Sequence, residues 1–88
     1  MINIFKSNVN GIDVILYIES DSKLTDLTML GIKNTIFGSN NLLKTTSIYE
    51  HINDTKFHEG LLTDIVSYST WRNNERIQME FSLKYIKN

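Results

Sequence analysis

The last third of the chain constrains the fold most, because residues 61–87 alternate between apolar and polar on both sides of one turn. A two-residue turn at Asn73-Asn74 sets Arg72 opposite Glu75 and fixes the pairing along both arms. One face of this hairpin is then almost wholly apolar, with the pairs Thr70–Ile77, Tyr68–Met79, Val66–Phe81, Asp64–Leu83 and Leu62–Tyr85. Since a slip of one residue would exchange the two faces, the pattern predicts this register along the whole hairpin.

A second hairpin is predicted over residues 2–19, where Asn10-Gly11 is a strong two-residue turn signal between arms rich in β-branched residues. The expected pairs on its apolar face are Val9–Ile12, Ser7–Val14, Phe5–Leu16 and Asn3–Ile18. At the open end the reverse face is apolar too, through Ile2, Ile4, Ile15 and Tyr17. A strand covered on both faces is central in a sheet or lies in a subunit interface, and we favour the core because a small domain needs its apolar side chains there.

The middle of the chain changes character. Asp21 or Ser22 is a candidate cap for a helix over about 22–33 that ends by Gly38, although many residues of the segment are weak helix formers. The alternation within 32–37 is also compatible with a strand. Farther on, Ser47 and Glu50 have the spacing of a capping box, which predicts a short helix over about 47–53.

These elements predict an α+β fold for residues 1–88 as a single domain. The two hairpins form one antiparallel sheet of about four strands, and the helical middle packs on it in the order ββααββ. The alternative is a small all-β barrel or sandwich in which residues 24–49 supply two more strands.

Composition limits the function classes that fit. The longest apolar run, residues 14–18, is far shorter than the roughly 20 residues of a membrane helix. Nine basic and ten acidic residues are spread along the chain, so the sequence has no basic cluster of the kind that binds nucleic acid. No cysteine and no secretory signal favour a cytoplasmic protein. The absence of Ala and Pro beside twelve Ile and ten Asn is typical of AT-rich coding, which indicates a low-GC bacterium or a phage or mobile element.

Ionisable residues are densest in the segment that contains His51 and His58 with Glu50, Asp54 and Glu59. Seven residues on one helix separate the two histidines by roughly 10 Å, too far for one metal ion. We therefore expect an exposed connector, with no metal site, no cofactor and no catalytic residue assigned. No nucleophile elbow is present, and the four glycines cannot build a phosphate-binding loop.

Trp71 is the most suggestive residue for binding. In the expected register it lies beside Arg72 and opposite Arg76 on the polar face of the second hairpin. Tryptophan and arginine dominate binding hot spots, although a simple stack of Trp71 on Arg76 would also explain the pair.

The leading functional hypothesis is a non-enzymatic binding protein, such as an inhibitor, immunity protein or regulator, that contacts a protein partner through Trp71, Arg72 and Arg76. The alternative is a structural subunit of a homo-oligomer or virion, assembled through Ile2, Ile4, Ile15 and Tyr17. A third hypothesis is a small enzyme or ligand sensor that uses His51 and His58. Membrane and nucleic-acid partners are not expected.

Overall fold

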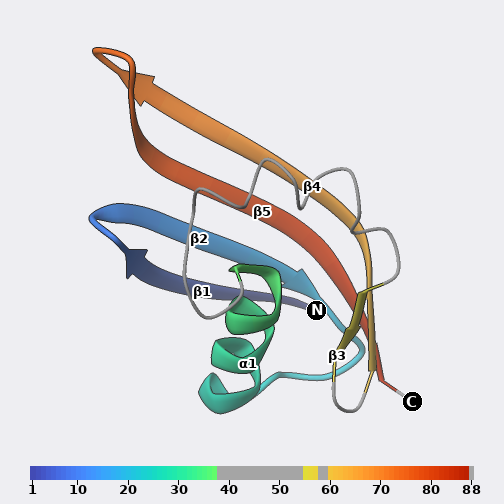
Figure 1. Ribbon diagram of the computed structural model, residues 1–88. Helices are drawn as coiled ribbons and strands as arrows, with labels where there is room; N and C mark the ends of the chain where they lie inside the picture. The colour runs from blue at the N-terminus through green and yellow to red at the C-terminus, as the bar shows by residue number, and fades with distance from the viewer. Residues whose placement is uncertain (38–54, 58–59, 88) are drawn as a thin grey trace.

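The computed structural model describes residues 1–37, 55–57 and 60–87, which form an α+β arrangement of one sheet and one helix (Figure 1). Four long strands and one short strand make up the sheet, in the order β1-β2-β5-β4-β3. The elements in chain order are β1 (Ile2–Val9), β2 (Ile12–Glu19), α1 (Asp26–Phe37), β3 (Thr55–Phe57), β4 (Gly60–Arg72) and β5 (Glu75–Lys87).

The turn and the register of the N-terminal hairpin are confirmed. β1 and β2 pair antiparallel from Ile2↔Glu19 to Val9↔Ile12, which includes every expected pair. Asn10 and Gly11 have φ values of 53° and 83°, and two positive φ angles in succession define the turn whose twist suits a two-residue hairpin.

The sheet is mixed, so the expected all-antiparallel arrangement is wrong. β2 and β5 run parallel, with Val14 opposite Met79, Leu16 opposite Phe81 and Ile18 opposite Leu83. β5 takes the central position in the sheet, and every second residue from Met79 to Tyr85 is apolar and buried. Strict alternation of this kind places one face of the strand on the core and the other face outward.

The helix lies four residues later than expected, at Asp26–Phe37. Neither Asp21 nor Ser22 caps it; instead the hydroxyl of Thr25 accepts a hydrogen bond of 3.2 Å from the Thr28 amide. A strand over 32–37, and with it the all-β alternative for this part of the chain, is therefore wrong. The order ββααββ is not matched, since the described residues contain one helix and the expected helix over 47–53 lies outside them.

α1 buries Met29, Ile32 and Ile36, at spacings of three and four, together with Phe37 against the sheet. Phe37 meets Phe81 edge-to-face, with ring centroids 5.2 Å apart. The other members of the same buried cluster are Val14, Leu16, Ile18, Leu62, Met79, Leu83 and Tyr85.

One buried polar side chain joins the edge of the sheet to the segment that precedes the helix. The Asn3 amide donates to the Ile18 carbonyl at 3.0 Å and to the Ser20 hydroxyl at 2.8 Å, and its oxygen accepts from the Leu24 amide at 2.8 Å. Since every polar atom of this side chain has a partner, its burial carries little penalty.

The C-terminal hairpin matches the expected register at both ends but not in the middle. Arg72↔Glu75 and Trp71↔Arg76 at the turn, and Leu62↔Tyr85 at the base, are as predicted, and Asn73 and Asn74 have φ values of 51° and 64°. Between the two ends the pairing is displaced by one residue, so that Ser69 faces Met79 and Ser67 faces Phe81.

Two compensating β-bulges produce this displacement. Near the turn β5 has one extra residue, Ile77, and near the base β4 has one extra residue, because Asp64 and Ile65 together oppose Leu83. Asp64 has a φ of 53°, a left-handed conformation that aspartate tolerates better than most side chains, and it is exposed.

Between the bulges the faces of β4 are exchanged, so the expected apolar face of this strand is wrong. Val66 and Tyr68 point away from the helix with exposed fractions of 65% and 69%, while Ser67 and Ser69 take the inner positions. The expected core positions at Leu62 and at every second residue of β5 from Met79 to Tyr85 are nevertheless correct, whereas Ile77, expected on the same face, is the extra residue of the bulge and is 41% exposed. A one-residue slip confined to the middle of the hairpin explains both results.

This register makes a direct prediction about stability. Tyr68→Ser and Val66→Thr should each change the free energy of unfolding by no more than about 0.5 kcal/mol, because both side chains are exposed. In a continuous register the same positions would be core positions, and truncation there would cost about 2–5 kcal/mol, as we expect for Leu83→Ala. Urea unfolding of the three variants distinguishes the registers, and a large loss for Tyr68→Ser would contradict the displaced one.

Candidate functional site

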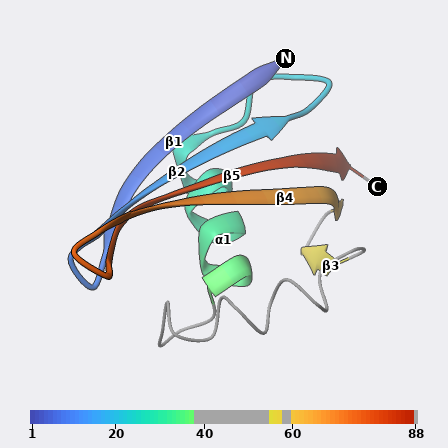
Figure 2. The same cartoon turned by 90° about the horizontal axis from the view of Figure 1, so that it is seen from above.

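One face of the sheet is open to solvent in the described part of the chain. α1 lies against the concave side, and no described helix or strand lies on the convex side (Figure 2). Strand alternation places the odd-numbered residues of β2 and the even-numbered residues of β1 on this open side.

Apolar side chains from three strands gather on the open side. The register aligns Ile4, Tyr17, Ser82 and Val66 in one row across the sheet. Ile15, Glu80 and Tyr68 form the adjacent row. We define the outer apolar face as Ile2, Ile4, Ile15, Tyr17, Val66 and Tyr68.

Four of these six residues are the ones that sequence reasoning singled out at the open end of the first hairpin. The structure brings Ile2, Ile4, Ile15 and Tyr17 together, but not in the core as we favoured. β1 is an edge strand, and the exposed fractions of Ile2 and Ile4 are 58% and 55%.

Sequence reasoning missed Val66, Tyr68 and Glu80 because it assumed a hairpin without bulges. The available signal was Asp64, an acidic residue inside a run of strand-forming residues. An aspartate in that context is a candidate for the left-handed position of a bulge. A bulge there shifts the following residues of β4 to the opposite face.

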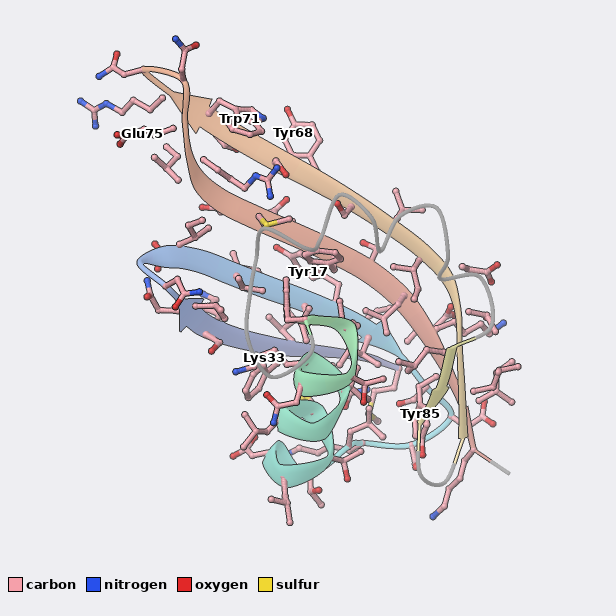
Figure 3. The ribbon with its side chains drawn as sticks, viewed as in Figure 1. Tyr17, Lys33, Tyr68, Trp71, Glu75 and Tyr85 are labelled. Atoms are coloured by element: carbon pink, nitrogen blue, oxygen red, sulfur yellow. The ribbon has the colours of Figure 1, made fainter. Side chains whose placement is uncertain are left out.

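Glu80 is the centre of a small polar network on the outer apolar face. One oxygen, Oε1, accepts a hydrogen bond of 3.1 Å from the Gln78 amide and one of 3.4 Å from the Tyr17 hydroxyl. Ile15 and Tyr68 flank Glu80 on the neighbouring strands. Tyr17 contacts this carboxylate from β2, and the register places Tyr68 of β4 next to Glu80; both tyrosines are labelled in Figure 3.

This environment shifts the acidity of Tyr17. Desolvation by the surrounding side chains and the nearby negative charge and hydrogen bond of Glu80 raise the pKa of the Tyr17 hydroxyl above its ordinary value. The hydroxyl therefore remains a donor to Glu80 up to a higher pH than an ordinary tyrosine hydroxyl would.

A titration tests this network. Glu80→Gln should lower the pKa of Tyr17 toward about 10, because it removes the neighbouring charge while the desolvation remains. The tyrosinate absorbance of the wild type, of Glu80→Gln and of Tyr17→Phe, measured against pH, isolates the Tyr17 transition. Since the folded chain holds this proton more tightly than the unfolded chain, its contribution to stability is intact below about pH 10 and falls as the pH rises through the folded pKa. An unchanged Tyr17 transition in Glu80→Gln would contradict the network.

The tip of the C-terminal hairpin is a separate feature. The pairing of β2 with β5 begins at Gln78, so the residues of β5 before it extend past β2. Here the Arg76 guanidinium lies over the Trp71 ring, 4.6 Å from its centroid, and Nη1 donates to the Met79 sulfur at 3.5 Å. Trp71 remains 55% exposed.

The three residues predicted to form the contact at this tip are only partly brought together. Trp71 and Arg76 form a cross-strand cation–π pair, as a purely structural role would require. By strand alternation Trp71 lies on the same side of β4 as Ser69, whereas Arg72 lies on the other. Arg72 is therefore not part of the stacked pair.

The edge of the sheet at β1 offers backbone groups for pairing. Met1 and Ser20 exchange two backbone hydrogen bonds of 2.9 Å. In an antiparallel pair such hydrogen-bonded positions recur at every second residue, so the odd-numbered residues of β1 direct their backbone groups toward β2. The N–H and C=O groups of Ile2, Ile4, Lys6 and Asn8 consequently point away from β2. Within the described ranges no strand pairs with this edge.

Other chemical sites have little support in the described residues. Among them no group of three metal-binding side chains is found, and no helix has the length and apolar character to cross a bilayer. His51 and His58 lie outside those residues, so their suggested role is not addressed. A shallow hollow of about 460 Å³ lies between the N-terminus and the end of β5, with mixed charges from Glu19, Asp21 and Lys84.

The chain was compared with protein-family models, with curated proteins and with solved structures, and none of the three comparisons gives a match.

Proposed function

We propose that this chain is a non-enzymatic protein-binding domain that acts by covering the surface of a protein partner with its outer apolar face. The observation that carries this proposal is the pair of compensating bulges, which turn Val66 and Tyr68 outward beside Ile15 and Tyr17. Burying one such side chain is worth about 1.5–3 kcal/mol, so the fold gives up stability to display them. Exposed apolar side chains that gather in one patch are typical of a binding surface.

The kind of binding protein is part of the same proposal. An inhibitor, immunity protein or small regulator of a phage, mobile element or low-GC bacterium, acting in the cytoplasm, fits a small chain without cysteine and with AT-rich composition. Such proteins need an interface and no catalytic group.

The hairpin tip is the other location for the contact. Trp71 has the exposed area of a hot-spot residue, but Arg76 already covers one face of its ring. Arg72 would have to contact the partner from the other side of the strand. We therefore assign the main contact to the outer apolar face and a lesser one to the tip.

Two matched double variants separate these locations. Val66→Asn with Tyr68→Ser should weaken binding of the partner, isolated from source cells on the wild-type chain, by about 100-fold, because two apolar anchors are lost. Trp71→Ala with Arg76→Ala should weaken it by less than about tenfold. Isothermal titration calorimetry gives both affinities, and the melting temperature verifies folding. Strong loss with the tip variant and none with the face variant would place the contact at the tip.

A second candidate function is a structural subunit of a homo-oligomer, for which the open edge of β1 is the specific support. Its four outward-pointing backbone units could pair with the same strand of another copy and continue the sheet. Ile2 and Ile4 of the two copies would then lie beside one another on the joined outer faces.

A proline at the edge tests this second function. Ile4 has its N–H on the open side of β1, so Ile4→Pro removes a donor needed for pairing between copies but none used within the hairpin. If copies pair through β1, the wild type sediments as a dimer or larger species at micromolar concentration, and Ile4→Pro sediments as a monomer. A wild-type monomer at that concentration would refute assembly through this edge.

A further inference from the structure

Glu80 occupies an unusual position for a charged residue. It is half-buried on a central strand, between Ile15 on one side and Tyr68 on the other, and Tyr17 contacts it across the diagonal. A protein that covers the outer apolar face must cover this carboxylate with it.

The hydrogen bonds of Glu80 leave one of its oxygens available. Both donors, from Gln78 and Tyr17, reach Oε1, and no donor or ion-pair partner among the described residues reaches Oε2. The nearest basic residues on the same face by register are Lys6, two strands away at about 10 Å, and Lys84, four residues along β5 at about 13 Å. The described part of the chain therefore supplies no cation to this carboxylate.

Covering Glu80 without a cation would oppose binding. Removing a carboxylate from water is costly unless an opposite charge and hydrogen bonds replace the water. A second copy of this chain is a poor occupant, because packing two outer faces about a two-fold axis brings two Glu80 carboxylates into one interface. The charge on this face thus selects a partner that carries a positive group.

We propose that the partner presents an arginine side chain to Glu80, an inference that rests on the protein-binding function proposed above. The guanidinium donates to Oε2 while its plane stacks on Tyr68, and apolar neighbours of that arginine cover the rest of the outer apolar face. Arginine fits better than lysine because its planar group is more weakly hydrated, stacks on aromatic rings and donates in fixed directions.

The test uses a pair of peptides that differ only in charge. The probes are acetylated and amidated Leu-Thr-Arg-Thr-Leu and the same peptide with citrulline, which keeps the shape of arginine without its charge. Titrated into the ¹⁵N-labelled chain, the arginine peptide should shift the amide signals of Ile15, Tyr17, Tyr68 and Glu80. It should bind about tenfold more tightly than the citrulline peptide, as expected for a charge-assisted hydrogen bond.

Glu80→Gln should abolish the difference between the two peptides. Glu19→Gln is the matched control, since Glu19 lies on the same face but at the exposed end of β2, and it should preserve the tenfold preference. Both variants replace a carboxylate by an amide of the same shape, and their melting temperatures verify folding.

Each other result overturns the inference in a distinguishable way. Equal binding of the two peptides at these four residues would refute the arginine contact but leave the protein-binding face in place. Shifts at other residues, or none, would also refute it, whereas the proposed function is decided by the partner affinities of the Val66 and Tyr68 variant. If dilution of the chain alone shifts the same four signals, the occupant is a second copy.

Discussion

The parallel pairing of β2 with β5 is the interaction on which the rest of the structure depends. It joins two hairpins that could not bury their apolar faces alone, and it aligns Val14, Leu16 and Ile18 with Met79, Phe81 and Leu83 in one continuous surface. α1 covers that surface, with Phe37 edge-on to Phe81. The helix occupies one side of the sheet, and no other described helix or strand covers the side chains that the same strands present on the other side.

The two bulges decide what that other side displays. A single bulge would shift the register of all residue pairs beyond it. The side chains at one end of the hairpin, either the turn or the base, would then lie on the wrong face of the sheet. Two bulges on opposite strands cancel, so Trp71↔Arg76 and Leu62↔Tyr85 keep the register set by the turn. The cost is local: Ser67 and Ser69 replace Val66 and Tyr68 on the inner side, and within the described residues the buried Ser67 hydroxyl has no hydrogen-bond partner.

Local signals predicted both turns, the N-terminal register, the ends of the C-terminal hairpin and the core positions of β5 from Met79 to Tyr85, since each depends on neighbouring residues or on strict alternation. Three results depend on longer-range contacts and were not predictable in this way. The parallel pairing of β2 with β5 requires knowing which hairpin arm lies in the centre. The helix start moved from Asp21 or Ser22 to Thr25 because Asn3 and Ser20 hold the preceding segment to the sheet. The one sequence signal for the bulges is Asp64, an aspartate within a run of strand-forming residues.

The positions where alternation predicted the faces correctly differ in location from those where it did not. Where the alternation rule succeeded, at Met79, Phe81 and Leu83, the residues build the core; where it failed, at Val66 and Tyr68, the residues surround Glu80. A fold selected for stability alone would gain by placing the two apolar side chains inside and the serines outside. The exception falls on the part of the sheet that carries the partly buried Glu80 carboxylate, which is where we propose that a positively charged partner surface binds.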